Sequence, residues 1–374
     1  MSIKNRKFFI AYNLHQMAKR NKKLLISFCK FIITGTSLLL LSAHSDRVSA
    51  NMDVQTIPDP YILYFPIAFN FGPNQSPYTT SYYMKTVQDS ALYAMGCELG
   101  ARDAALPGTQ NNVVVLDFGY PICSGDSFGA DLFGFGPVFS SAIAAGAENF
   151  GLGYYTCTGQ DITSSLVIGI GTNNKKISCI TSAEAFAHGA AWSQIANSAN
   201  QWFVDNNLIQ QVSAVGASDI ELGFNGPTWS RAWVDGFDSV NKTIMLFFGD
   251  AAGCPYDGNT WSCGTPTYPE WSVEDVWYVS YGASPSYPIP LIYLKSGVHA
   301  KQWATMSSYS YYEHGSRIDF LGVFTQYQAC QQRGCTTTDN TPEEAMTQML
   351  TELGKDENIM QEIRWQTDIK WMWE

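Results

Sequence analysis

Charged residues are scarce in this chain: 15% of its 374 residues are Asp, Glu, Lys or Arg, whereas 45% are hydrophobic. A chain of this length and composition can bury a large core, and its composition excludes long disordered stretches. We therefore expect a globular protein, with one large domain behind a leader.

Several motifs that mark whole classes of enzyme are missing. The chain has neither GxGxxG nor a P-loop lysine, and the glycine-rich stretch 125–136 is too irregular for a nucleotide fingerprint. No cysteine pair has CxxC spacing, and no histidine stands near a pair, so zinc is not predicted. GxSxG is absent too, which makes a serine hydrolase a remote alternative. We predict no metal and no cofactor.

The start of the chain has the pattern of a secretory leader. A basic segment is followed by an apolar one, and the sequence VSA ending at Ala50 supplies the small residues that a signal peptidase reads. We predict a signal peptide over 1–50 and a secreted mature protein without stable membrane insertion. Met17, followed by AKRNKK, is an alternative start. Lys30 interrupts the apolar run and argues against a membrane span, with an uncleaved anchor as the alternative.

Basic residues become rarer still once the leader is removed. The leader holds nine of the 22 Lys and Arg and one of the 33 Asp and Glu, which leaves a net charge of −19. This charge excludes nucleic acid as a partner. It also opposes approach to anionic wall polymers, although screening limits that repulsion to about 8 Å at physiological ionic strength.

Eight cysteines lie beyond the leader, an even number that fits an exported, oxidised protein. The local pairs are Cys254 with Cys263 and Cys330 with Cys335. The other four allow three pairings, and the sequence does not choose between them; they are Cys97, Cys123, Cys157 and Cys179.

Buried strands recur along the chain with helical segments between them. The expected strands are 61–70, 111–120, 165–173, 212–224, 243–250, 276–282, 289–294, 302–307 and 318–326. The expected helices are 79–105, 138–150, 182–206, 227–240 and 341–353. This order predicts an α/β fold of the (β/α)8-type TIM barrel, irregular because two late helices are missing or short.

We divide the chain into the leader, a barrel over 51–326 and a C-terminal helical and aromatic tail over 327–374. The tail contains Trp365, Trp371 and Trp373. Because three exposed tryptophans would promote aggregation, we expect the tail to pack on the barrel.

The strongest candidate for chemistry is the stretch 212–224, which we interpret as a strand that ends with two carboxylates, Asp219 and Glu221. Alternate residues of an extended chain face the same side, so the two Cβ atoms should lie about 6–7 Å apart. Two acids at the carboxyl end of a barrel strand are typical of glycosidases. The alternative is a solvated strand end or a helix cap.

Four segments resemble glycoside hydrolase family 25, the barrel lysozymes, and suggest a secreted bacterial member. They are Asp219-Ile220-Glu221, the VWYVSYG of 276–282, the QWATMS of 302–307 and the GSRIDF of 315–320. The family's opening segment has its nearest match at 115–119, which makes Asp117 the candidate for that acid. Family 18 chitinases rank lower, because their pattern needs further acids where this chain has Ala214 and Ala217.

The resemblance implies that Glu221 is the general acid and that Asp219 raises its pKa and orients the substrate's acetamide or a water. Asp117 and Asp319 would line the same mouth. We expect sugar-binding aromatic faces at Tyr256, Trp261, Trp271 and Trp303. The implied substrate is peptidoglycan or a related polysaccharide.

A non-catalytic barrel that binds carbohydrate or a protein partner would keep the same fold signals. Under that alternative the acids at strand ends serve capping alone. The two hypotheses differ in what happens when Glu221 loses its charge, because only an enzyme would lose turnover.

Overall fold

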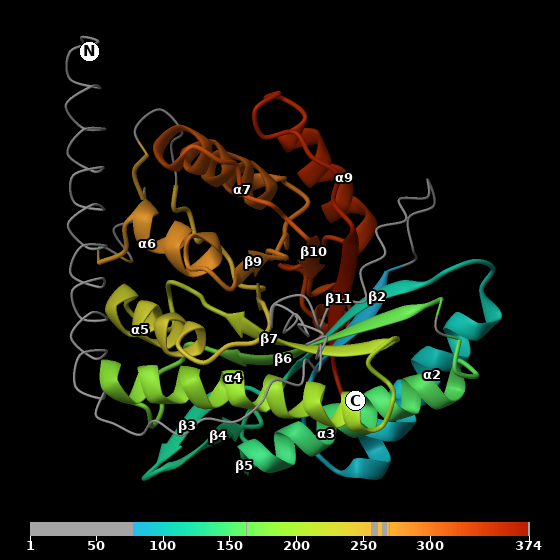
Figure 1. The fold of residues 1–374 in the computed structure, drawn as a ribbon. Helices are drawn as coiled ribbons and strands as arrows, with labels where there is room; N and C mark the ends of the chain where they lie inside the picture. The colour runs from blue at the N-terminus through green and yellow to red at the C-terminus, as the bar shows by residue number, and fades with distance from the viewer. Residues whose placement is uncertain (1–77, 162, 256–260, 264–267, 269, 373–374) are drawn as a thin grey trace, which may run out of the picture. The chain divides into compact units, whose positions relative to one another are not determined.

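The computed structural model describes residues 78–372 except 162, 256–260, 264–267 and 269. Within this part, eight parallel strands form one sheet in the order β10-β11-β1-β2-β6-β7-β8-β9 (Figure 1). Their bounds are β1 Thr79–Tyr83, β2 Asn111–Asp117, β6 Ser165–Asn173, β7 Val212–Asp219, β8 Met245–Phe247, β9 Ser286–Pro288, β10 Gly322–Thr325 and β11 Trp365–Trp371.

The two ends of this sheet come together. Just beyond β9, Leu291 forms a parallel bridge with Phe324 of β10, and the Ile292 N–H donates to the Phe324 carbonyl at 2.9 Å. The sheet is therefore a nearly closed barrel, consistent with the TIM-like architecture that the sequence predicts.

Apolar side chains form two layers, one inside the barrel and one outside it. Val115, Val215 and Phe324 belong to the inner cluster, whereas Trp192 and Phe237 belong to the larger cluster between strands and helices. Strands covered on both faces should be apolar throughout, and β2, β6 and β7 are buried along almost their whole length.

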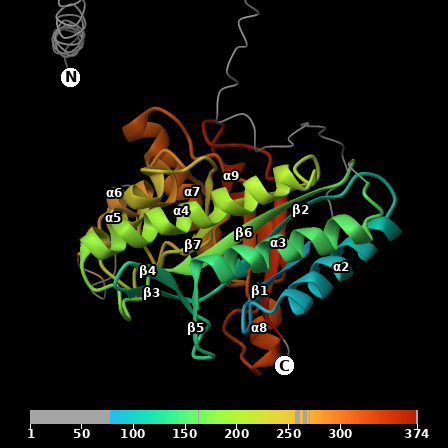
Figure 2. The same cartoon turned by 60° about the horizontal axis from the view of Figure 1, so that its bottom comes forward.

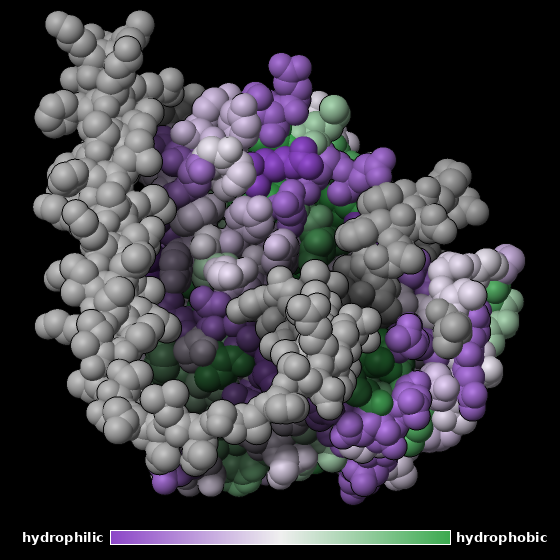
Figure 3. All heavy atoms as spheres, viewed as in Figure 1, coloured by the Kyte–Doolittle hydropathy of each residue, from purple (hydrophilic) through white to green (hydrophobic). Residues whose placement is uncertain are grey.

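Helices surround the sheet. Their bounds are α2 Asp89–Ala105, α3 Ser140–Cys157, α4 Ser182–Asp205, α5 Pro227–Asp238, α6 Val273–Trp277, α7 Val298–Tyr309, α8 Tyr327–Gln332 and α9 Pro342–Leu353, with π-helices η1 Tyr278–Gly282 and η2 Ser310–His314. Figure 1 shows α2, α3, α4 and α5 on one side and α7 and α9 on the other. Figure 2 shows α2, α3 and α4 side by side over the strands. The face seen in Figure 3 is mostly hydrophilic, with smaller hydrophobic areas.

Glycines allow neighbouring helices to approach closely. A Cβ on Gly153 of α3 would lie 2.1 Å from the Tyr93 carbonyl oxygen of α2, and one on Gly189 of α4 would lie 1.9 Å from the Trp233 carbonyl oxygen of α5. Neither position can accept a side chain unless the two helices separate.

Four sequence predictions of local structure are wrong. Residues 79–83 form strand β1 rather than the start of a helix, and 276–282 and 302–307 are helical rather than strands. These two helices are the ones that the sequence reading missed. The signal was present in α7, whose buried residues include Ala300, Trp303 and Ser307 at helical spacing. The predicted strand 289–294 is irregular apart from the single bridge at Leu291. The predicted strand 61–70 lies outside the described residues.

A small antiparallel sheet interrupts the barrel after β2, where the sequence reading expected a loop. It consists of β3 Tyr120–Ser124, β4 Ser127–Asp131 and β5 Pro137–Phe139. His188 of α4 anchors it: Trp233 Nε1 donates to Nδ1 at 2.9 Å, which leaves Nε2 to donate to the Gly129 carbonyl at 2.8 Å. Burial lowers the His188 pKa to about 4, so the ring is neutral and structural.

The aromatic end of the chain is part of the barrel rather than a helical tail. The C-terminal region contains α8 and α9, but β11 inserts between β10 and β1, pairing in parallel with both. The sequence WQTDIKW alternates, and Trp365, Thr367, Ile369 and Trp371 are all buried. This period of two is the strand signal that the sequence reading overlooked.

Four disulfides link described residues. Cys254–Cys263 and Cys330–Cys335 confirm the predicted local pairs. Of the three pairings open to the other cysteines, the structure has Cys97–Cys157, which joins α2 to α3, and Cys123–Cys179, which joins β3 to the segment before α4. Such bonds are typical of exported proteins. Among the described residues, no helix is both long enough and apolar enough to span a membrane.

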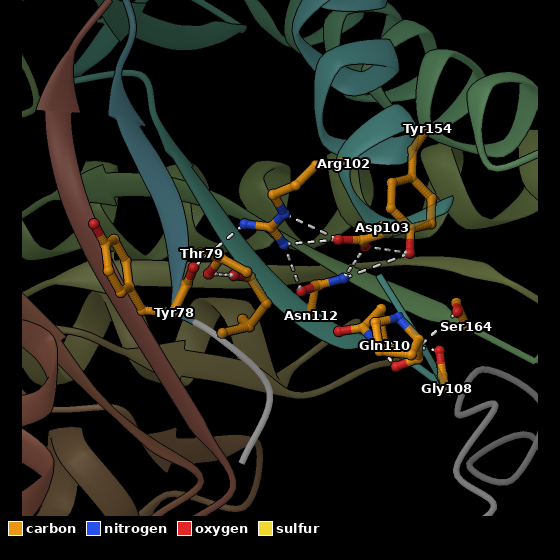
Figure 4. Close-up of polar contacts among 11 residues, drawn as sticks. Tyr78, Thr79, Arg102, Asp103, Gly108, Gln110, Asn112, Tyr154 and Ser164 are labelled. Atoms are coloured by element: carbon orange, nitrogen blue, oxygen red, sulfur yellow. Dashed lines mark hydrogen bonds and ion pairs between the residues drawn. The ribbon is translucent and has the colours of Figure 1, made fainter. Parts of the chain in front are cut away.

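A buried polar network lies at the amino end of the barrel (Figure 4). Asp103, at the end of α2, accepts hydrogen bonds from Tyr154 at 2.9 Å, from Asn112, and from Arg102 Nη2 at 2.8 Å. Both carboxylate oxygens are engaged, so this acid ties α2, β2 and α3 together.

Candidate functional site

Acidic side chains gather at the opposite, carboxyl end of the barrel. Parallel strands bring all their carboxyl ends to one rim, and β2 and β7 end in Asp117 and Asp219. Glu221 stands two residues beyond β7, and Asp250 three beyond β8. The charges of Asp117 and Asp250 raise the pKa values of both Asp219 and Glu221, so the four form one cluster, which we call the acid cluster.

Asp117 is fully buried. Its Oδ1 accepts a hydrogen bond from the Gly119 N–H at 2.9 Å, and its Oδ2 has no partner among the described residues. Burial raises the Asp117 pKa to about 7, against the opposing effect of the Gly119 N–H. This carboxyl group therefore exchanges its proton near neutral pH.

Asp219 and Glu221 are the central pair. Burial, and then the charges of Glu221 and the other acids, raises the Asp219 pKa well above its ordinary value. Burial followed by the Asp250 charge raises the Glu221 pKa to about 8, while a hydrogen bond from Tyr293 lowers it. Glu221 is half-buried and thus open to solvent on one side.

The backbone of Glu221 is held by the Asn174 side chain. Asn174 Nδ2 donates to the Glu221 carbonyl at 3.1 Å, and the Glu221 N–H donates to Asn174 Oδ1 at 3.1 Å. Because Asn174 follows β6 directly, the neighbouring strand fixes the acid's position beyond the end of its own strand.

Asp250 differs from the other acids in its protonation. Burial raises its pKa to about 6, partly offset by a hydrogen bond from the Ala252 N–H. Burial and the neighbouring Asp250 charge raise the Glu221 pKa further than burial raises the Asp250 pKa, so Glu221 keeps its proton to a higher pH. Neighbouring carboxyl groups whose pKa values are pushed apart are the usual arrangement of an acid and its charged partner.

Two buried tyrosines and one amide complete the polar part of the site. Tyr293, beyond β9, lies with its hydroxyl 3.4 Å from Glu221 Oε1. Gln326, directly after β10, donates through Nε2 to the hydroxyls of Tyr293, at 3.1 Å, and Tyr83, at the end of β1. The site therefore draws side chains from strands around the whole barrel.

Aromatic rings lie beside the acid cluster. The Tyr83 and Trp371 ring centroids are 4.5 Å apart, and Phe133 packs edge-on against both at 5.2 and 5.3 Å. The Arg333 guanidinium lies 3.5 Å from the Trp371 ring centroid, and Lys85 Nζ lies 5.7 Å from it. Arg333 and Lys85 therefore place positive charge on these aromatic rings, at the edge of an acidic site.

Asp319 lies away from the acid cluster. It precedes β10, so it belongs to the amino end of the barrel, where it pairs with Arg317 at 3.6 Å and contacts the Tyr281 hydroxyl at 3.4 Å. Three of the four predicted catalytic acids, Asp117, Asp219 and Glu221, come together, and Asp319 does not.

The predicted sugar-binding aromatic residues make other contacts in the structure. Trp303 is fully buried in α7 against Phe247, and Trp271 is buried with its Nε1 donating to the Asn225 carbonyl at 3.0 Å. Trp261 packs against Tyr309, on a helix outside the barrel, with ring centroids 5.5 Å apart. Tyr256 lies outside the described residues.

The site residues that the sequence reading missed are Tyr83, Asp250, Tyr293, Gln326 and Trp371. All follow or end barrel strands, but the sequence predicts a helix around Tyr83 and a tail around Trp371. Asp250 ends the predicted strand 243–250, and no motif around it indicates a site. Tyr293 and Gln326 stood at the ends of predicted strands without any motif around them.

Not every buried acid at this end belongs to the cluster. Asp368 of β11 accepts hydrogen bonds from Thr325 Oγ1 at 2.6 Å and from the N–H groups of Tyr327 and Gln328 at 2.8 and 2.9 Å. It caps α8 and is fully engaged. Within the described ranges, no group of three His, Cys, Asp or Glu side chains is arranged to hold a metal ion.

No protein-family model matches the chain, and no curated protein matches its sequence significantly.

Proposed function

We propose that the protein is a secreted glycoside hydrolase in which Glu221 is the general acid. The observation that carries this proposal is the acid cluster itself: four carboxyl groups at the carboxyl end of a parallel barrel, of which Glu221 keeps its proton to a higher pH than Asp250. Hydrolysis of a glycosidic bond needs one carboxylic acid to give a proton and one carboxylate to balance positive charge.

In this mechanism Glu221 transfers its proton to the oxygen of the leaving sugar as the glycosidic bond breaks. Asp250 supplies the negative charge that stabilises the positive charge developing on the other sugar. Asp219 orients the substrate's acetamide or the attacking water, while the charges of Asp250 and Asp117 help to keep Glu221 protonated. The water's proton returns to the acid cluster, which restores Glu221.

The proposed substrate is peptidoglycan or a related amino-sugar polymer. Sugar rings stack on aromatic faces, and Tyr83, Phe133 and Trp371 provide such faces next to the acids. Arg333 and Lys85 add positive charge there, which suits a glycan that carries carboxylates despite the acidic surface of the chain.

Secretion is part of the proposal. The leader pattern of residues 1–50 and the four disulfides among the described residues both support export and cleavage near Ala50. The resemblance to family 25 lends less support, because two of its four segments, 276–282 and 302–307, form helices here.

The test is release of reducing ends from purified peptidoglycan and from chitin oligosaccharides by the oxidised protein, beside its Glu221→Gln variant. Removal of a general acid lowers turnover about 10²- to 10⁴-fold. The variant keeps the size of the side chain and removes one buried ionisable group, so we expect its thermal stability to match or exceed that of the wild type.

Glu313→Gln is the matched control. Glu313 is an exposed glutamate of η2, which precedes β10, whereas the acid cluster lies where the strands end. Equal activity in this control and loss in Glu221→Gln would support the proposal. No activity from folded, oxidised wild-type protein on either polymer would favour the non-catalytic carbohydrate-binding alternative, which a pull-down with the same polymers would then test.

A further inference from the structure

The side chain of Gln326 hydrogen-bonds to residues from two other parts of the barrel. Its backbone is fixed where β10 meets α8, because its carbonyl accepts the Cys330 N–H at 2.9 Å. From there Nε2 reaches two tyrosine hydroxyls that come from β1 and from the segment after β9. One amide therefore joins three parts of the barrel rim.

The direction of these hydrogen bonds follows from chemistry. An amide nitrogen only donates, so both tyrosine hydroxyl oxygens accept from Gln326. Each hydroxyl has a single proton, which must then point to another acceptor. For Tyr293 that acceptor is Glu221 Oε1, 3.4 Å away.

Tyr83 ends β1 directly opposite Asp117 in the parallel pairing of β1 with β2. The charges that act on it most strongly are those of Asp219 and then Asp117. Asp219 Oδ1 and Asp117 Oδ2 each lack a hydrogen-bond partner in the described part of the chain. A Tyr83 proton turned in that direction serves these oxygens directly or through a water.

We propose that Gln326 is a positioning residue that turns the hydroxyl protons of Tyr83 and Tyr293 toward the acid cluster. This inference deepens the proposed hydrolase function and, for its effect on turnover, rests on it. A hydroxyl donor stabilises an ionised carboxylate, so the two tyrosines help Glu221 to release its proton despite its burial.

Two substitutions separate the donor role from mere packing. Gln326→Glu keeps the shape but can only accept, so both tyrosine protons turn to it and away from the acid cluster. Gln326→Leu removes the donor without adding charge. The readout is the pH titration of the Glu221 side-chain carboxyl carbon by ¹³C NMR, assigned by its loss in Glu221→Gln.

We expect the Glu221 titration midpoint to rise by about one pH unit or more in Gln326→Glu and by a smaller amount in Gln326→Leu. In the hydrolysis assay, kcat should fall about 10-fold with KM within about 2-fold, and the alkaline limb of the rate profile should move to higher pH. Gln331→Glu, which adds the same charge on the exposed side of α8, is the control and should move neither.

The titration needs no substrate, so it distinguishes the two proposals. If the wild-type protein is inactive but the Gln326 variants shift the Glu221 titration midpoint, the positioning role stands and the hydrolase function is overturned. Unchanged midpoints in both Gln326 variants, or an equal shift in Gln331→Glu, would overturn the positioning role even if the protein is active. If Gln326→Glu does not fold, the titration of Gln326→Leu decides.

Discussion

The barrel buries acids at both ends, and Asp103 at the amino end differs from the acid cluster at the carboxyl end in its hydrogen bonds. At the amino end, both oxygens of Asp103 are satisfied by Arg102, Asn112 and Tyr154. At the carboxyl end, Asp117 and Asp219 each keep one oxygen without a partner in the described part of the chain. A satisfied carboxylate stabilises the fold, whereas an unsatisfied one costs stability and is retained where chemistry uses it.

Charge reinforces this difference. Asp103 is paired with the cation Arg102, at 2.8 Å. Asp219 instead faces three like charges, from Glu221, Asp117 and Asp250, all of which raise its pKa. The acid of the amino end is thus paired with a cation, whereas the candidate site at the carboxyl end holds acids that face like charges.

The largest effect on stability is expected at the amino end. Asp103→Ala leaves Tyr154, Asn112 and Arg102 without their shared acceptor, so the free energy of unfolding should fall by about 3–5 kcal/mol. Turnover per folded molecule should not change, because the site lies at the other end. Denaturant unfolding and a rate measured on the folded fraction check this. A loss below about 1 kcal/mol would contradict the role assigned to the network.

A smaller effect of opposite sign is expected for Asp117→Asn. The folded protein keeps a proton on Asp117 up to about pH 7, whereas an ordinary Asp releases it near 3.8. Wild-type stability is therefore lost as the pH rises between these values, and the variant, which cannot ionise, avoids this loss.

The Asn side chain can still accept a hydrogen bond from the Gly119 N–H. The free energy of unfolding of Asp117→Asn should therefore exceed that of the wild type by about 1–3 kcal/mol at pH 8 and equal it at pH 4. Urea unfolding at pH 4, 6 and 8 measures the difference, and turnover should fall. A gain that does not depend on pH would show that packing, rather than ionisation, causes it.

The smallest effect is expected for Asp319→Asn. Its carboxylate is more than half exposed and pairs with Arg317, itself partly exposed, so the pair adds little stability. We expect unchanged unfolding and a rate within about 2-fold of wild type. A large loss of turnover would restore the catalytic role that the resemblance to barrel lysozymes implies and break the division between the two ends.

How well the sequence predicted each secondary-structure element depended on its local pattern of residues. The strands of β2, β6 and β7 are long apolar runs that predict buried strands, and their acids were found with them. VWYVSYG and QWATMS have the β-branched and aromatic residues of strands, yet they form helices because their apolar faces meet the barrel at helical spacing. Composition alone did not separate these two outcomes.

The sequence by itself determined the α/β class, the two local disulfides and the position of Asp117, Asp219 and Glu221 after buried strands. Only the tertiary structure decided that these three acids meet one another, that Asp250, Tyr83, Tyr293 and Gln326 join them, and that Asp319 faces the other way. The physical reason is that a parallel barrel gathers the carboxyl ends of strands far apart in the chain, and no local periodicity records which strands will lie next to one another.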